Sequence, residues 1–381
     1  MASGLPLKTI KSARLMSKRA SKPVVNVAAT IYNILAIIVV FLVTLASMLT
    51  WKNLKGHTVK NGAKRKNNMN WFYHQFMKRI ILTFNPFWER KLSFEVDPEE
   101  LKKNTYLYAC NHTSYSDFIM LSGVADLNYV GVGKSDLLHM PIVGPVFQNN
   151  GFLPVEFEQK PNGKWGTKPG STERLMRWAK KDLENDVSII LFPEGTIVLD
   201  YELGKFKPGF FKLAIETDTP VVPIGTWGNQ FIWPMLSKSV PSKNMSSGTS
   251  YVKVGTPMEP LNPSELEGMS DALAITDYVV DKYNLSQEEA EFKDLEIAIA
   301  AVADAGKDSE ETDEESELLK KSVVSLFTEL VRTKVLTLRL DCEEMLAKDE
   351  EKRVKDDEKS NEYYADLIQK AVDQGKEVLS M

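Results

Sequence analysis

A long uncharged stretch near the N-terminus sets the first limit on how this chain can fold. No charged residue occurs from Pro23 to Trp51, and the segment from Ile31 to Val43 is almost entirely apolar. About 20 apolar residues suffice to cross the ~30 Å hydrocarbon core of a bilayer. Within a bilayer, such a segment satisfies its backbone groups as a helix. The stretch therefore predicts a membrane helix, although it is rich in β-branched residues.

Basic residues on both sides of this stretch leave its topology open. Residues 1–88 carry 14 Lys and Arg and no acidic residue, which suits an anionic membrane surface. Six basic residues precede the stretch and six follow it closely, so the usual excess of positive charge on one side is absent. A spanning helix and a segment that enters and leaves on one face are both compatible with this pattern. Residues 1–22 form a basic flank, whose composition also fits a transit peptide.

A second membrane-associated helix is expected within residues 23–90. Residues 70–90 mix aromatic and aliphatic side chains with Lys78 and Arg79. This composition is typical of an amphipathic helix at the membrane surface, with Trp71 and Trp88 at the level of the headgroups. A helix that packs into the protein core is the alternative.

Short apolar runs alternate with helical patterns through residues 91–262. This alternation predicts an α/β fold with a mixed, largely parallel sheet flanked by helices. Exposed loops are expected at 159–170 and 235–250, and Ser171 or Thr172 is expected to cap a helix. The predicted strands cover residues 92–96, 106–110, 129–133, 150–155, 188–192, 221–224 and 251–255.

Residues 263–381 are predicted to form a helical, acidic C-terminal extension. Residues 286–381 carry 14 basic and 27 acidic residues, as expected for solvated helices. An acidic linker is expected at 307–317. Apolar residues then recur at helical spacing from Leu318 to Leu346, which predicts an amphipathic helix that packs on the domain or on another helix.

Two polar motifs directly follow predicted buried strands. His112 and Asp117 lie within Asn-His-Thr-Ser-Tyr-Ser-Asp, after the strand at 106–110. A neutral imidazole can accept a proton near pH 7, and a carboxylate on its other nitrogen would orient it. A structural pair is the alternative reading of these two residues. Glu194 follows the predicted strand at 188–192, within Phe-Pro-Glu-Gly-Thr. Because sites in these sheets lie beyond the carboxyl ends of the strands, we expect one shared cleft.

The motifs NHTSYSD, FPEGT, KFKPG and VVPI, in this order and spacing, resemble those of the glycerolipid acyltransferases over about residues 85–260. The best-known members of that family are lysophosphatidic acid acyltransferases. The resemblance implies acyl transfer from acyl-CoA to the free hydroxyl of lysophosphatidic acid, giving phosphatidic acid, with His112 as general base and Asp117 orienting it. Acyl-CoA would be a co-substrate, and no cofactor, metal or nucleic acid is expected. The expected location is the endoplasmic reticulum membrane with a cytosolic site, and a plastid membrane is the alternative.

The resemblance also implies the substrate-binding residues. Lys134 matches the family's lysine before an acidic residue and a leucine, and would stabilise the oxyanion. The acceptor would be bound by a set of residues that follow the strand at 188–192, namely Glu194, Gly195, Thr196, Lys205 and Lys207. Each of the three lysines could instead be an ordinary surface residue.

Two departures from the family pattern leave the acceptor open. Relatives that use lysophosphatidic acid usually carry arginine directly after Glu-Gly-Thr, where this chain has Ile197. They also tend to carry arginine after the strand at 150–155, where this chain has Glu156 and Phe157. Arginine binds phosphate bidentately, whereas lysine acts as a point charge. Another lysophospholipid, glycerol 3-phosphate, or an inactive membrane scaffold are therefore the alternatives.

Other classes of function find little support. No Gly-x-Ser-x-Gly nucleophile elbow occurs, which argues against a serine hydrolase. The two cysteines, Cys110 and Cys342, form neither a disulfide framework nor a metal-binding spacing. Cys110 is expected to be a buried core thiol.

Overall fold

The computed structural model describes residues 23–54, 73–124, 129–161, 165–199, 202–237, 240–307 and 313–380. The basic flank at 1–22 and Trp71 lie outside these ranges.

A seven-stranded sheet forms the centre of the molecule, and its order is β1-β11-β8-β2-β7-β3-β4. All neighbours are parallel except β8 and β11, so the sheet is mixed and largely parallel, as predicted. Strand β2 pairs on both sides, and its Ala109 lies level with Leu191 of β7 and Pro223 of β8. The strands are β1 (Trp88–Phe94), β2 (Leu107–Cys110), β3 (Tyr129–Lys134), β4 (Leu153–Val155), β7 (Ser188–Leu191), β8 (Val221–Trp227) and β11 (Gly248–Val254).

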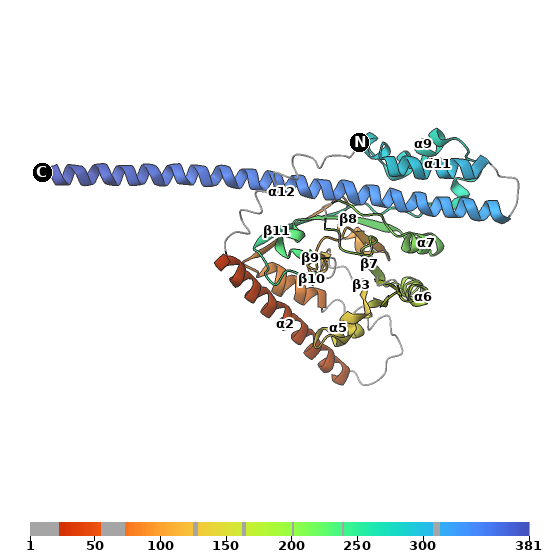
Figure 1. Ribbon diagram of the computed structural model, residues 1–381, viewed down its shortest axis with the longest axis horizontal. Helices are drawn as coiled ribbons and strands as arrows, with labels where there is room; N and C mark the ends of the chain where they lie inside the picture. The colour runs from red at the N-terminus through yellow and green to blue at the C-terminus, as the bar shows by residue number, and fades with distance from the viewer. Residues whose placement is uncertain are drawn as a thin grey trace.

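Helices cover the sheet on both faces (Figure 1). The three central strands β2, β7 and β8 are buried along their whole length, which explains their continuous apolar runs. The helices are α2 (Pro23–Leu54), η1 (Met77–Thr83), η2 (Glu100–Lys102), α4 (Ser116–Met120), η4 (Ser135–His139), α5 (Val143–Asn150), α6 (Ser171–Leu183), α7 (Gly209–Glu216), α8 (Asn229–Ile232), η5 (Pro263–Glu265), α9 (Ala272–Tyr283), α10 (Gln287–Ala290), α11 (Lys293–Lys307) and α12 (Asp313–Ser380).

The predicted N-terminal apolar helix is confirmed as α2. Within the described ranges, it contains one segment, Asn26–Ser47, that is long and apolar enough to cross a membrane. One face of α2 packs on the domain, where Phe41 lies 5.6 Å from Tyr73 and 5.7 Å from Phe147 between ring centres.

The prediction of one amphipathic helix over residues 70–90 is wrong at its C-terminal end. The helix ends at Thr83, because Asn85 accepts hydrogen bonds from the N–H groups of Phe87 and Trp88 and turns the chain into β1. Trp88 is only 2 % exposed, and its indole N–H donates to the Ser246 carbonyl at 3.0 Å. It belongs to the core and not to a membrane surface.

Both predicted loops contain strands. The first holds β6 (Trp165–Thr167), which forms a hairpin with β5 (Phe157–Gln159) at the start of this loop. The second holds β9 (Met235–Ser237), β10 (Val240–Pro241) and the start of β11. The second segment also contacts α2, since the N–H of Met245 donates to the Thr30 hydroxyl at 2.8 Å. The N-cap of α6 is Gly170 and not Ser171, whose hydroxyl instead accepts the N–H of Glu156 at 2.8 Å.

The predicted C-terminal amphipathic helix is part of α12, which crosses one face of the sheet and continues past the domain (Figure 1). The helix comes very close to β8, because a β-carbon on Gly225 would lie 2.7 Å from the Leu338 β-carbon. The inner face of α12 is buried against the sheet and its neighbouring helices through Val323, Leu326, Phe327, Leu330, Val331, Val335, Leu338, Cys342 and Leu346.

Candidate active site

His112 and Asp117 form a hydrogen-bonded pair at the carboxyl end of β2. His112 lies in the loop after the strand, and Asp117 lies in the first turn of α4. The Nδ1 atom of His112 is 2.7 Å from an oxygen of Asp117. The side chain of Asp117 is fully buried, whereas that of His112 is 18 % exposed. The pair therefore joins a buried carboxylate to an imidazole that reaches the surface.

The carboxylate of Asp117 is surrounded by donors. One oxygen accepts the backbone N–H groups of Thr113 at 2.6 Å and Ser114 at 2.9 Å, besides the imidazole. The other accepts the side-chain amide of Asn229 at 2.8 Å. Because a carboxylate only accepts hydrogen bonds, Nδ1 of His112 carries the proton of the pair. In the neutral imidazole, Nε2 then presents a lone pair.

Neighbouring contacts fix the ring and its loop. The imidazole stacks on Phe192 with 4.0 Å between ring centres. Asn111 bridges the loop to β8, since its side chain donates to the Thr226 carbonyl at 3.0 Å and accepts the Thr226 N–H at 2.8 Å. The hydroxyl of Ser114 donates to the Trp233 carbonyl at 2.7 Å. The polar residues of the motif thus attach the loop to β8 and to the segment that follows it.

Glu194 holds the backbone of His112 from the neighbouring strand. One of its oxygens accepts the His112 N–H at 2.7 Å, and the other accepts the Gly204 N–H at 2.9 Å. The Val198 N–H donates to the His112 carbonyl at 2.9 Å. Burial raises the pKa of Glu194 to about 7, although both N–H donors act to lower it. The loop after β7 therefore holds His112 through both of its peptide groups.

Gly195 makes room for the side chain of Lys207. Its φ of +67° is a conformation that glycine adopts readily, and a β-carbon there would lie 2.7 Å from Lys207 Cε. The Lys207 N–H also donates to the Pro193 carbonyl at 2.9 Å. Thr196 is half-buried beside them. The side chain of Lys207 thus crosses the Glu-Gly-Thr turn at Gly195.

The structure places Lys134 beside Phe157 and Lys205 near Glu329. Lys134 ends β3, which is separated from β2 by β7, and its ammonium lies 5.6 Å from the centre of the Phe157 ring. Two strand spacings amount to ~10 Å. Lys205 is exposed. Burial raises the pKa of Glu329 of α12, and the charges of Arg332 and Lys205 oppose this rise.

The positions that depart from the family pattern are occupied in other ways. Ile197 is 3 % exposed, so its side chain packs inside the protein. Glu156 pairs with Arg174 at 2.7 Å and with Lys168 at 3.1 Å. Neither residue offers a cation to a phosphate.

Asn229 is a site residue that sequence reasoning missed. It follows β8 after one intervening residue, Gly228, and its side-chain amide donates to Asp117. The rule that places His112 and Glu194 at strand ends applies equally to β8. The sequence feature that could have identified this site residue is the Gly228-Asn229 pair after that strand.

The raised pKa of Glu194 predicts a specific pH dependence of stability. Its folded pKa lies above its ordinary value near 4.5, so the folded state binds the extra proton, and stability falls as pH rises from about 4.5 to above 7. Glu194→Gln removes this ionisation. Across that pH range, the unfolding free energy of the wild type should therefore fall on the order of a few kcal/mol more than that of the variant. Urea unfolding in detergent between pH 4.5 and 8 measures it. The same dependence of the unfolding free energy on pH in the two proteins would contradict this prediction.

Comparisons with known proteins find similarity to acyltransferases over part of the chain. The profile of the Acyltransferase family matches residues 93–227. A 1-acyl-sn-glycerol-3-phosphate acyltransferase from Limnanthes alba is 27% identical over 147 residues, 38% of this chain and 49% of that protein. The 1-acyl-sn-glycerol-3-phosphate acyltransferase BAT2, chloroplastic, from Brassica napus is 31% identical over 134 residues, 35% of this chain and 36% of that protein.

The matched region is one part of each protein. The chain spans about half the length, or less, of these curated relatives. The crystal structure of the 1-acyl-sn-glycerophosphate (LPA) acyltransferase PlsC from Thermotoga maritima superposes with a TM-score of 0.46 at 21% identity, over 62% of this chain and 86% of that one. The part of the chain that carries His112, Asp117 and Glu194 therefore matches the Acyltransferase family, over residues 93–227.

Proposed function

We propose that this protein transfers the acyl group of acyl-CoA to the free hydroxyl of lysophosphatidic acid, giving phosphatidic acid. The observation that carries the proposal is the 2.7 Å bond between His112 Nδ1 and the buried Asp117 carboxylate, which leaves Nε2 available as a base. The named activity of the curated relatives supports the same reaction.

The reaction needs one base, which then acts as an acid. The acceptor hydroxyl oxygen attacks the thioester carbonyl carbon while His112 Nε2 takes the hydroxyl proton. Asp117 stabilises the imidazolium that forms. When the tetrahedral intermediate collapses, the carbon–sulfur bond breaks and the imidazolium returns its proton to the departing CoA sulfur. A positioned general base contributes typically ~10²–10⁴-fold in rate.

The lysines would handle the negative charges. Lys207 crosses the turn beside Glu194 and is the proposed partner of the acceptor phosphate, with Lys205 on the same loop. Glu194, Gly195 and Thr196 would shape the acceptor site around it. Lys134 is the proposed cation for the oxyanion, a role that requires it to leave the Phe157 ring and reach across β7.

A second candidate is acyl transfer to another lysophospholipid or to glycerol 3-phosphate. The buried side chain of Ile197 and the paired Glu156 favour a lysophospholipid with a headgroup, because neither position supplies the arginine expected for a phosphomonoester such as lysophosphatidic acid or glycerol 3-phosphate.

The geometry of α2 supports insertion into one leaflet. The domain contacts α2 at Thr30, through Met245, and at Phe41, through Tyr73 and Phe147. These contacts are separated by 11 residues, or ~16 Å of helix. A helix that crossed the membrane would carry this part of the domain into the hydrocarbon. The face of α2 away from the domain exposes Val27, Ile31, Ile34, Leu35, Ile38, Val39, Leu42 and Val43.

We therefore propose that the outer face of α2 lies in lipid. We further propose that this membrane is that of the endoplasmic reticulum and that the site faces the cytosol. A plastid membrane is the alternative, since one relative is named as chloroplastic. Phe84, which is exposed beside α2, would enter the same lipid layer, because the Tyr32 hydroxyl of α2 donates to its carbonyl at 2.9 Å.

Labelling in sealed vesicles tests this topology. Ile10→Cys and Lys60→Cys, made one at a time, should react with an impermeant maleimide from the same side, because both flanks of α2 lie on one face. The native Cys110 and Cys342 are buried and provide the unlabelled background. Labels on opposite sides would show a spanning helix and contradict the one-leaflet arrangement.

Acyl transfer to a panel of acceptors tests the activity. Purified protein in detergent receives labelled oleoyl-CoA with glycerol 3-phosphate, lysophosphatidic acid, or lysophospholipids that carry choline, ethanolamine, serine, glycerol or inositol. We expect the highest kcat/KM with lysophosphatidic acid, and a Lys207→Ala variant should lose most of that preference.

The other outcomes are informative. Preference for an acceptor with a headgroup would support the second candidate and remove lysophosphatidic acid as the physiological acceptor. Absence of transfer to every acceptor by folded protein would favour an inactive membrane scaffold.

A further inference from the structure

The C-terminal helix α12 contacts the loop that carries the proposed acceptor lysines. Arg332 of α12 donates from Nε to the Gly204 carbonyl at 3.1 Å and from Nη2 to the Leu203 carbonyl at 3.2 Å. Its side chain is 15 % exposed. These two carbonyls directly precede Lys205. The residue lies outside the region that matches the family profile, which ends at 227.

The third guanidinium nitrogen of Arg332 fixes its orientation. Nη1 lies 3.0 Å from Asp294 of α11 and 3.2 Å from Glu329 of α12. The planar guanidinium thus binds two carboxylates through Nη1 and two adjacent carbonyls through Nε and Nη2. Lysine could not reproduce this arrangement, because its ammonium is a point charge on a flexible stem.

Two further hydrogen bonds connect Arg332 to the histidine. The Gly204 N–H donates to Glu194 at 2.9 Å, and the other Glu194 oxygen accepts the His112 N–H at 2.7 Å. A β-carbon on Gly204 would lie 2.7 Å from the Glu194 oxygen that accepts the Gly204 N–H, so the contact between the loop and Glu194 is close. A displacement of the loop would therefore change the hydrogen bonding of Glu194.

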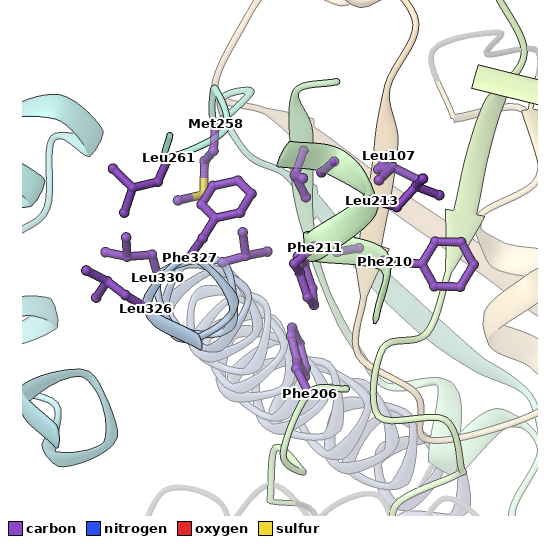
Figure 2. Close-up of a cluster of buried hydrophobic side chains, with 14 of the residues drawn as sticks. Leu107, Phe206, Phe210, Phe211, Leu213, Met258, Leu261, Leu326, Phe327 and Leu330 are labelled. Carbon is purple, nitrogen blue, oxygen red and sulfur yellow. The ribbon is translucent and has the colours of Figure 1, made fainter. Parts of the chain in front are cut away.

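Aromatic packing holds the other side of this loop. Figure 2 shows Phe206 against Phe211 of α7, and Phe327 of α12 beside the same cluster. Phe206 and Phe211 are stacked with 6.0 Å between ring centres, and Phe211 meets Phe327 edge-on at 6.4 Å. The side chains of Lys205 and Lys207 are exposed on either side of the buried Phe206. The loop is therefore fixed on α12 while its lysines face outward.

We infer that Arg332 is a positioning residue that sets the acceptor-binding geometry of the loop at 203–207. It acts through the two carbonyls on the placement of Lys205 and Lys207, and through Glu194 on the backbone of His112. The inference rests on the proposed function for its kinetic consequence. It assigns to the C-terminal extension an indirect part in acceptor recognition, through the loop at 203–207.

Three variants of the full chain test the inference. Arg332→Ala removes both carbonyl contacts. Arg332→Lys keeps the charge but not the paired geometry. Lys334→Ala is the matched control, because it removes an ion pair between α12 and Glu289 of α10 without touching the loop. The readouts are hydrogen exchange of peptides that cover 111–117 and 203–207, and KM values for lysophosphatidic acid and oleoyl-CoA.

We expect Arg332→Ala to speed exchange in both peptides and to raise the KM for lysophosphatidic acid on the order of tenfold, as the loss of one charge-assisted hydrogen bond would. The KM for oleoyl-CoA should stay the same. Arg332→Lys should restore part of the acceptor KM, and Lys334→Ala should change neither measurement. The unfolding midpoints of Arg332→Ala and Lys334→Ala are compared, so that general destabilisation is distinguished from the loss of the loop contacts.

Unchanged exchange in Arg332→Ala would overturn the inference, as would an equal rise of both KM values. If the wild type transfers no acyl group, the proposed function fails. The exchange comparison of Arg332→Ala with Lys334→Ala then still decides whether Arg332 positions the loop.

Discussion

A buried carboxylate must be surrounded by hydrogen-bond donors, and this constraint shapes the ends of the central strands. Asp117 has no exposed side-chain surface, and its donors come from its own loop, from His112 and from Asn229 after β8. Glu194 collects N–H groups from His112 and Gly204. Removing one donor leaves charge uncompensated. The two carboxylates thus require the loops after β2, β7 and β8 to meet at one point.

The sequence predicted the parts of this arrangement that depend on local pattern. The buried runs of β2, β7 and β8 identified the sheet, and the polar residues after the first two strands identified His112, Asp117 and Glu194. Other features depend on contacts between distant segments, which local patterns do not contain. Trp88 was assigned to a membrane surface because its partner, the Ser246 carbonyl, lies in a segment expected to be a loop.

The C-terminal extension illustrates the same limit. Its amphipathic spacing predicted a packed helix correctly, yet gave no sign that Arg332 would reach the carbonyls of the loop before Lys205. The close approach at Gly225 brings α12 onto β8, and β8 also delivers Asn229 to the pair. The domain therefore lies between α2 on the proposed lipid side and α12 on the other (Figure 1).

The central claim is that His112 acts as the base in acyl transfer, and one comparison tests it directly. Turnover of labelled oleoyl-CoA is measured with His112→Ala and with His139→Ala, an exposed histidine of η4 that serves as the control. We expect a loss of at least ~10²-fold in His112→Ala while this variant remains folded under the assay conditions, and wild-type turnover in His139→Ala. Near wild-type turnover in folded His112→Ala would contradict the account.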